Sequence, residues 1–164
     1  MEQADKKMDI LGIGPMFGGL SVMYSIIMFL VSFYYKPFFK IGMISYHLLV
    51  IIAVVLVVIG ITFLIISIIT FNKGFHANIL VKVGIYRCCR HPLYTAWSIF
   101  IVPGFILLTA SWLNLTIPIF MYFVSRLLVK KEEEYLEATF GDEYLEYKAQ
   151  VPSIIPYGCL RKTK

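Results

Sequence analysis

Long stretches without a charged residue alternate with short polar intervals along the chain. The first charge-free stretch covers residues 10–35, and its 26 residues would form a helix about 39 Å long at about 1.5 Å per residue. Because the hydrocarbon core of a bilayer is about 30 Å thick, this stretch predicts a membrane-spanning helix. The second stretch, residues 41–72, is rich in Ile, Val and Leu and predicts another span within residues 41–71.

A third stretch, residues 93–125, also lacks charge, and mostly apolar sequence extends from residue 95 to residue 129. Helix-breaking or polar residues interrupt it at Pro103-Gly104, Ser111, Asn114 and Pro118. Two full spans and a loop need more than about 40 residues, so we expect a helical hairpin that turns near residues 109–114 and has short or kinked arms. The pattern predicts an all-α integral membrane protein with about four transmembrane helices, a polar loop and C-terminal amphipathic helices.

Composition points to the same class. The 164 residues are 59% hydrophobic and 15% charged, with a mean hydropathy of +0.79, whereas soluble domains are about 45–50% apolar and about 25% charged. We expect one domain over residues 1–164, with two N-terminal spans in residues 10–72 and the polar chemistry in residues 73–164. The net charge of +5 comes from Lys and Arg residues that border apolar stretches. Membrane lipids explain this charge, and no nucleic-acid partner is expected.

The distribution of basic residues predicts the orientation in the membrane. Four spanning helices place both termini on one face, and thirteen of the fifteen Lys and Arg residues fall on that face. Only Lys36 and Lys40, in an expected tight loop, fall on the other. Since cytoplasmic loops carry the excess of Lys and Arg, we expect a multi-pass protein whose termini and polar interval between residues 73 and 90 lie in the cytoplasm.

Small residues and cysteines suggest two further local features. The spacing Gly14-x-x-x-Gly18 predicts close packing of the first helix against a neighbour. The three cysteines, Cys88, Cys89 and Cys159, lie outside the apolar stretches without the spacing of a zinc site. We therefore expect reduced cytoplasmic thiols and no bound metal.

Two polar segments carry the candidate chemistry. Residues 84–94 form a basic interval between two charge-free stretches, and ionisable groups at a membrane are usually retained for function because their insertion is costly. Pro92 disfavours a helical His91, so a turn can aim Arg90 and His91 inward. Seven of the ten acidic residues fall within residues 132–146, where we expect Gly141 to end one helix and Asp142 to cap the next.

Together the two segments resemble the isoprenylcysteine carboxyl methyltransferase family and, more loosely, the membrane phospholipid methyltransferases. The resemblance covers residues 78–157, and its motifs occur in the family's order. They are Leu80-Val81-x-x-Gly84-Ile85-Tyr86, Arg90-His91-Pro92-x-Tyr94, Glu132-Glu133, Phe140-Gly141-Asp142-Glu143-Tyr144-x-x-Tyr147 and Val151-Pro152-x-x-x-Pro156.

The resemblance implies that S-adenosyl-L-methionine binds at the cytoplasmic face and that a lipid-like or prenylated acceptor enters from the bilayer. Arg90, His91 and Glu133 would be catalytic, and Arg126 and Lys130 would contact the substrate carboxylate. The implied cofactor contacts are Asn78, Ile79, Leu80, Val81, Tyr86, Arg90, His91, Pro92, Tyr94, Glu132 and Glu133.

The residue chemistry agrees with this expectation. Methyl transfer from a sulfonium releases a neutral thioether, so alignment of the reactants and exclusion of water matter more than acid catalysis. Arg90 and His91 suit the cofactor's carboxylate, while Glu132 and Glu133 suit its ammonium or its ribose hydroxyls.

Several acceptors and functions stay open at this point. An isoprenylcysteine-type carboxylate is already ionised at neutral pH and needs no base, which favours O-methylation. A phospholipid amine or a small thiol is the alternative acceptor. An NADPH-dependent sterol-type reductase and a non-enzymatic membrane scaffold are the alternative functions.

Overall fold

The computed structural model describes residues 14–42, 44–77 and 79–160, and the regular elements among them are helices. The first half forms α1 (Gly14–Tyr34), the short α2 (Lys36–Phe39) and the long α3 (Tyr46–Ala77). A broken helix follows, made of α4 (Pro92–Thr95), the π-helical turn η2 (Ala96–Ile101) and α5 (Val102–Leu107). The last helices are α6 (Thr116–Phe140) and α7 (Asp142–Gln150), and single 3₁₀ turns lie at η1 (Gly84–Arg87), η3 (Leu113–Leu115) and η4 (Gly158–Leu160).

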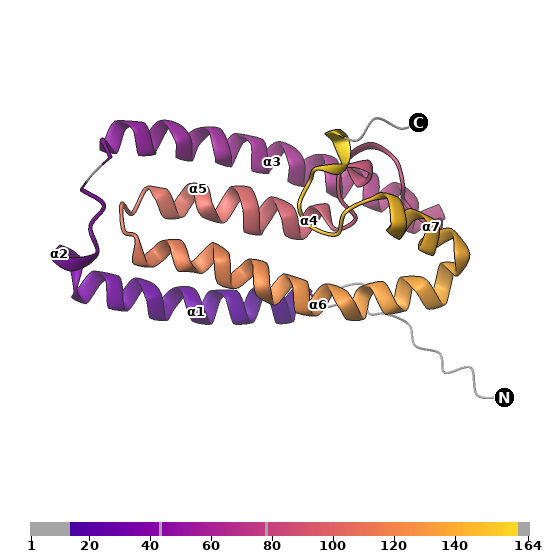
Figure 1. The fold of residues 1–164 in the computed structure, drawn as a ribbon, viewed down its shortest axis with the longest axis horizontal. Coiled ribbons are helices and arrows are strands. Elements are labelled where there is room, and N and C mark those ends of the chain that lie inside the picture. The colour runs from indigo at the N-terminus through magenta and orange to yellow at the C-terminus, as the bar shows by residue number, and fades with distance from the viewer. Residues whose placement is uncertain (1–13, 43, 78, 161–164) are drawn as a thin grey trace.

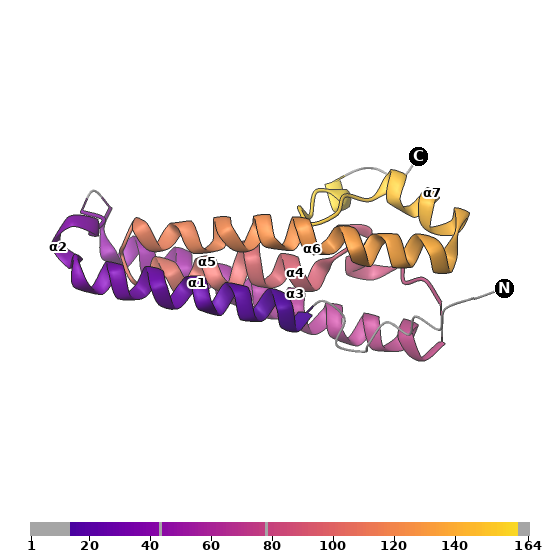
Figure 2. The same ribbon diagram turned by 90° about the horizontal axis from the view of Figure 1, so that it is seen from below.

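The long helices run side by side along the long axis of the molecule, with α2 at one end and α7 at the other (Figures 1 and 2). α1 packs on α6, and α3 packs on the broken helix. Among the described residues, three helical segments are long and apolar enough to cross a membrane, and the shorter apolar segment Pro92–Leu107 lies beside them. The predicted all-α membrane fold with a C-terminal helical hairpin is therefore confirmed.

The hairpin turns near residues 109–114, as the polar residues in this stretch predicted. α5 ends at Leu107, and α6 follows η3 from Thr116. The kink in the first arm is the π-helical turn η2, which directly precedes Pro103 in α5. Because Pro103 has no amide hydrogen to donate to the carbonyl four residues earlier, the helix widens at this point.

Glycines let α3 approach the broken helix closely. A Cβ atom at Gly60 would lie 2.6 Å from Cγ1 of Ile101, and one at Gly104 would lie 2.7 Å from Cγ2 of Val57. The predicted packing at Gly14-x-x-x-Gly18 is wrong within the described part of the chain, where no atom comes within 4 Å of a Cβ placed at either glycine. Close packing through small residues thus occurs between α3 and the broken helix.

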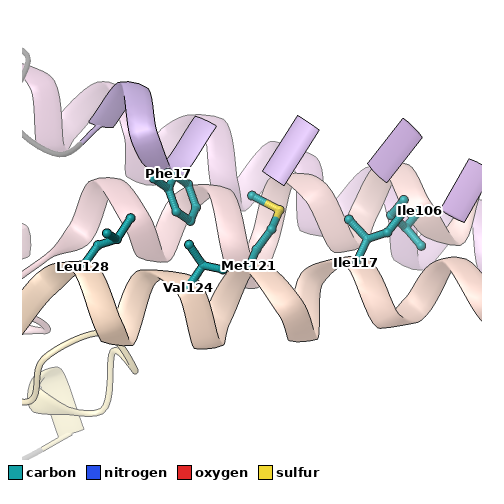
Figure 3. Packing of buried hydrophobic residues seen from close by; sticks show 6 residues of the cluster. All are labelled: Phe17, Ile106, Ile117, Met121, Val124 and Leu128. Carbon is teal, nitrogen blue, oxygen red and sulfur yellow. The ribbon is translucent and has the colours of Figure 1, made fainter. Parts of the chain in front are cut away.

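The buried apolar cluster lies between α1, α5 and α6. Six side chains form it: Phe17, Ile106, Ile117, Met121, Val124 and Leu128 (Figure 3). Large apolar side chains also cover the outside of the bundle, for example Phe33 at 69% exposure and Leu127 at 66%. A surface of this kind is solvated by lipid tails rather than by water, so it agrees with a membrane-embedded bundle.

Two local predictions are corrected. Residues 36–39 form the helical turn α2 instead of a loop, and the chain after it pairs with the hairpin turn through Ile41 N–H to Ala110 O at 2.8 Å. Gly141 ends α6 with a φ of +54°, as predicted, because glycine tolerates this backbone conformation. The N-cap of α7 is Gly141, however, and Asp142 is the first helical residue without a capping side-chain bond.

Candidate active site

The two polar segments meet at the end of the bundle where α7 lies. The basic interval forms the turn η1, passes through His91, whose backbone is neither helical nor extended, and enters α4 at Pro92. Pro92 suits this position because the first turn of a helix does not need its amide hydrogen. The C-terminal part of α6 and the folded-back α7 lie beside it (Figure 2).

Glu133 is the centre of a dense polar network. Its Oε1 accepts hydrogen bonds from Arg90 Nη2 at 2.5 Å and Nε at 3.2 Å. The same oxygen lies 3.2 Å from His91 Nε2 and accepts a 3.2 Å bond from Ser153 Oγ. Oε2 lies 3.5 Å from Lys148 Nζ. The Arg90, His91 and Glu133 side chains are only 9%, 3% and 11% exposed, so these charges depend on one another for compensation.

Arg90 also holds the C-terminal end of α7. Its Nη1 donates to the backbone carbonyl of Lys148 at 3.0 Å and to that of Val151. The last carbonyls of a helix lack intrahelical partners and carry partial negative charge, so a guanidinium there is favourable. A single side chain therefore connects the Glu133 carboxylate to the position of α7.

Residues 151–158, which we call the strap, run alongside residues 88–95. Pro152 and Ser153 accept backbone hydrogen bonds from Arg90 at 2.9 Å and His91 at 3.0 Å. Thr95 Oγ1 lies 2.5 Å from the Ile154 carbonyl oxygen, and Gly158 N–H donates to Cys88 O at 3.0 Å. The strap thus fixes the backbone on both sides of the Arg90-His91 pair.

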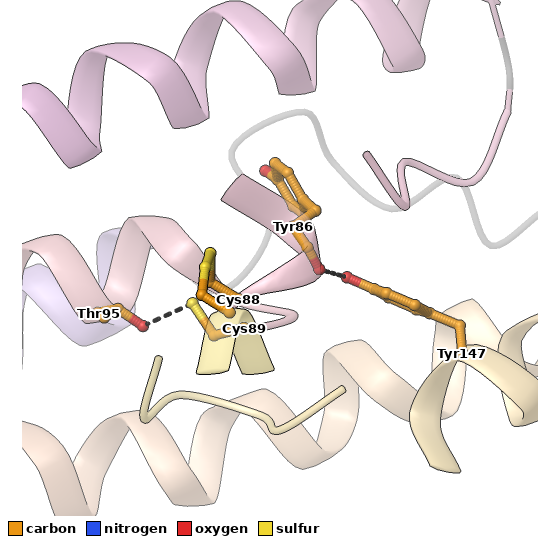
Figure 4. The surroundings of a disulfide bond; sticks show 6 residues. Tyr86, Cys88, Cys89, Thr95 and Tyr147 are labelled. Atoms are coloured by element: carbon orange, nitrogen blue, oxygen red, sulfur yellow. Dashed lines mark hydrogen bonds between the residues drawn. A yellow bond between two sulfur atoms is a disulfide. The ribbon is translucent and has the colours of Figure 1, made fainter. Parts of the chain in front are cut away.

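The cysteines differ from the sequence-based expectation. Cys88 and Cys159 are joined by a disulfide, with Cα atoms 4.4 Å apart, so these two are not free thiols (Figure 4). Cys89 is a free, fully buried thiol whose sulfur lies 3.4 Å from Thr95 Oγ1. Burial raises the pKa of Cys89 to about 11, which keeps it protonated and unsuited to act as a nucleophile at neutral pH.

The two adjacent glutamates are not equivalent. Glu132 Oε1 lies 3.7 Å from His91 Nδ1, beyond hydrogen-bonding distance, and its side chain is 24% exposed. After burial, its negative charge raises the pKa of the Tyr86 and Tyr94 hydroxyls, and it also accepts a hydrogen bond from Tyr94. Glu132 is therefore the member of the pair with capacity for another partner, whereas Glu133 is occupied by neighbouring side chains.

His91 lies between the two carboxylates. Burial lowers the pKa of its imidazole, but the hydrogen bond to Glu133 and the nearby carboxylates of Glu132 and Glu133 outweigh burial and raise the pKa above its ordinary value. The protonated form, in which both ring nitrogens donate, is therefore favoured.

The structure brings together most of the predicted site residues. Arg90, His91, Pro92, Glu132 and Glu133 share the end of the bundle. Tyr94 packs near His91 with ring centroids 6.2 Å apart, and the Tyr86 carbonyl accepts a 2.6 Å bond from Tyr147 (Figure 4).

Other predicted residues lie apart from this network. Ile79, Leu80 and Val81 belong to an irregular segment, and Lys82, directly after it, forms a 2.7 Å ion pair with Glu143 of α7. Asn78 lies outside the described residues. Arg126 and Lys130 are exposed on α6.

Sequence reasoning missed two members of the network, Lys148 and Ser153. Lys148 is the basic residue in the last turn of α7, and its Nζ also lies 3.2 Å from Glu137 Oε2. Ser153 follows Pro152 in the motif that ends at Pro156. Both are ordinary polar residues in sequence, and only the folding back of α7 and the strap brings them to Glu133.

The chain forms a helical membrane bundle that ends in a buried network of Arg90, His91 and Glu133. Comparison with known protein families identifies the class to which such a chain belongs. The family model described as phospholipid methyltransferase matches residues 41–143, and the chain belongs to this family. The match contains the broken helix, α6 and the paired glutamates.

Within this family, the curated relatives that the chain resembles are named as protein-S-isoprenylcysteine O-methyltransferases. The chain is 41% identical over 86 residues to the protein-S-isoprenylcysteine O-methyltransferase of Saccharomyces cerevisiae, 34% over 80 residues to form B of Arabidopsis thaliana and 30% over 86 residues to the Homo sapiens protein. These alignments cover 49%, 48% and 52% of this chain. They cover only 34%, 40% and 30% of the relatives. The predicted family resemblance is confirmed, and no solved structure gives a significant match.

Proposed function

We propose that the protein is an integral membrane methyltransferase that uses S-adenosyl-L-methionine and modifies a lipid-like acceptor. The observation that carries the proposal is the convergence of Arg90, His91, Glu132 and Glu133 at one end of an apolar helical bundle, within a phospholipid methyltransferase family match. Its relatives are named as methyltransferases that act on protein S-isoprenylcysteine.

The donor set fits this cofactor. A carboxylate, an ammonium and ribose hydroxyls must be bound, and the site offers cationic Arg90 and protonated His91 beside the incompletely engaged carboxylate of Glu132. When bound, the cofactor supplies an electrophilic methyl group on a sulfonium. Tyr86, Pro92 and Tyr94 would form the wall around it, with Asn78, Ile79, Leu80 and Val81 as further proposed contacts.

In this assignment Glu133 positions the other groups. Its carboxylate orients Arg90 and His91, and Arg90 in turn holds α7 and the strap over the site. These contacts exclude water and fix the geometry, which are the main requirements for direct methyl transfer. Arg90, His91 and Glu133 are therefore proposed to act mainly through binding and orientation.

An isoprenylcysteine-type carboxylate is the acceptor that the site favours. Its oxygen is already ionised and needs no base, whereas His91 and Cys89 in the site are both biased toward protonation. Arg126 and Lys130 are seven and three residues before Glu133 on α6, spacings that share a helix face, and remain the proposed carboxylate contacts. The acceptor's apolar tail would enter from the bilayer between helices.

A phospholipid amine is the second candidate acceptor because the matching family is described as phospholipid methyltransferase. Such an amine must lose a proton, and Glu132 is the carboxylate with room to accept it. The distribution of Lys and Arg supports a cytoplasmic orientation for either reaction.

One experiment tests the proposal in two stages. S-Adenosylhomocysteine should protect the detergent-solubilised protein against thermal unfolding, whereas NADPH should not. Radiolabelled cofactor should then transfer its methyl group to one member of a panel of prenylcysteine, phospholipid and thiol acceptors. Protection by NADPH alone, or no protection by either compound, would contradict the proposal.

A further inference from the structure

Two cavities lie at the α2 end of the bundle, opposite the candidate active site. One, of about 750 Å³, lies between α1 and the hairpin turn, with Ile26, Phe29 and Leu30 on its apolar side. The other, of about 460 Å³, is lined by apolar side chains that include Ile44 and Leu49. Both cavities share Lys40 and the turn residues Thr109 and Ala110.

The charge at this end is entirely basic. All acidic residues after position 9 fall within residues 132–146, so Lys36 and Lys40 have no carboxylate nearby on α1, α2 or the hairpin turn. Both lysines are exposed, and Lys36 Nζ lies 4.6 Å from the centre of the Phe33 ring. Lys36 begins α2 and Lys40 is the residue directly after it, so two positive charges lie at the two ends of this short helical turn.

The first cavity also has a polar floor. Ser32 and Ser111 share a hydrogen bond of 2.8 Å, and Asn114 donates to Thr109 Oγ1 at 3.1 Å. Asn114 is 1% exposed, and its Oδ1 accepts no hydrogen bond from any described residue. Since a buried carbonyl without a donor is costly, a hydroxyl or a water that arrives with a ligand would stabilise it.

We propose that this end of the bundle binds an anionic glycerophospholipid. The phosphate would lie between Lys36 and Lys40, and the two acyl chains would begin in the two cavities that meet at Lys40. Because the distribution of Lys and Arg predicts that this end lies at the non-cytoplasmic face, the lipid would come from that leaflet. Two lysines attract its negative headgroup, and two apolar cavities beside the same lysine distinguish a two-chain lipid from a free phosphate.

This lipid site is separate from the methyl-transfer site. Residues 116 to 133 of α6 lie between the two ends, a helical rise of about 26 Å at about 1.5 Å per residue. The proposal therefore does not depend on the proposed function, and the bound lipid is not the methyl acceptor.

The test measures thermal unfolding of the full chain in a neutral detergent with added lipid. Phosphatidylglycerol should raise the midpoint, and phosphatidylcholine and inorganic phosphate should not, because neither combines negative charge with two chains. The double variant Lys36→Gln, Lys40→Gln should bind phosphatidylglycerol about 30-fold more weakly, close to 2 kcal/mol at about 1 kcal/mol per lysine.

Two variants control for general effects. The double variant Lys73→Gln, Lys131→Gln removes the same charge at the other end and should bind phosphatidylglycerol as the native protein does. Leu30→Trp, at a position that is 64% exposed, should fill the apolar side of the larger cavity and weaken lipid binding without lowering the lipid-free midpoint.

Equal binding by the two double variants would overturn the proposal, as would equal stabilisation by phosphatidylcholine or by inorganic phosphate. Stabilisation by S-adenosylhomocysteine, measured in the same samples, reports separately on the proposed enzymatic site. Loss of one effect without the other therefore identifies which assignment has failed.

Discussion

Charged side chains are buried and paired at one end of the bundle, and exposed without a carboxylate partner among the described residues at the other. At the α7 end, Arg90, His91 and Lys148 surround one nearly buried carboxylate and satisfy one another. At the α2 end, Lys36 and Lys40 lie exposed beside apolar cavities in a region of the sequence without acidic residues. Charges that pair within the protein stabilise the local structure. Charges without a carboxylate partner in the protein are available to bind an external partner at the membrane. The predictions below test whether this contrast is functional.

The largest effect is expected at Glu133. Replacing Glu133 by Gln keeps its size but leaves Arg90 and His91 without their shared anion, which should destabilise the protein by about 3–5 kcal/mol. Thermal unfolding in detergent measures this loss. Glu134→Gln is the control because Glu134 is exposed on the same helix. Similar small shifts for both variants would contradict the central role of Glu133.

Glu132 should give a different result from its neighbour. Glu132→Gln should change the free energy of unfolding by less than about 0.5 kcal/mol. It should weaken S-adenosylhomocysteine binding by roughly tenfold to a hundredfold, since a charge-assisted bond contributes about 1.5–3 kcal/mol. Calorimetric titration measures the affinity, with Glu134→Gln as the control because Glu134 is exposed on the same helix. Unchanged binding would remove Glu132 from the proposed cofactor contacts.

The strap can be displaced by a single methyl group. A Cβ atom at Gly158 would lie 2.5 Å from Arg87 O and 2.7 Å from Cys88 O, so Gly158→Ala should cost about 1–3 kcal/mol. Hydrogen exchange should increase in residues 151–158, and cofactor affinity should fall with it. Gly18→Ala is the matched control because no described atom lies within 4 Å of its new Cβ. Unchanged exchange in the strap would show that its pairing does not depend on Gly158.

A smaller effect is expected from pH. Because the folded-state pKa of His91 is raised, its contribution to stability is fully present below the ordinary pKa of about 6.5 and is lost as pH rises through the raised value. The unfolding midpoint of the native protein should therefore fall as the pH rises above the ordinary pKa of histidine and through the raised value. His91→Gln should fall less over this range, and parallel curves for the two proteins would argue against a protonated His91.

Two single cysteine substitutions at exposed positions, which should perturb the structure least, test which face of the membrane each end of the bundle occupies. Phe38→Cys, at a position that is 77% exposed, should react with a membrane-impermeant thiol reagent in intact cells. Ala138→Cys, exposed on α6 near the other end, should react only after permeabilisation. Reaction of both sites from outside would place the lysine end and the Glu133 end on the same face.

Features that repeat along a helix or break it could be predicted from the sequence. Charge-free stretches predicted the spans, and the polar residues between Pro103 and Pro118 predicted the hairpin and its turn. These signals are local, since span length, missing amide hydrogens and turn preferences depend on neighbouring residues.

The internal arrangement of the site could not be predicted in the same way. Adjacent helix residues point about 100° apart, so the sequence could not say which of Glu132 and Glu133 faces inward. The strap and the Cys88–Cys159 disulfide join irregular segments, the latter across a separation of 71 residues. Such pairings carry no periodic signal, which is why Lys148 and Ser153 were missed and the cysteines were misassigned.

The strap has a consequence for biosynthesis. Gly158 N–H, which bonds to Cys88, is made 67 residues after His91, and at about 5–20 residues per second the ribosome needs roughly 3–13 s to reach it. For the first part of that interval Arg90 and His91 lack Glu133, and they lack the strap carbonyls of Pro152 and Ser153 until those residues are made near its end. The helices can enter the membrane as they emerge, but the polar end can be assembled only after translation has passed the strap. A nascent chain arrested before residue 151 should therefore be membrane-inserted and unable to bind cofactor.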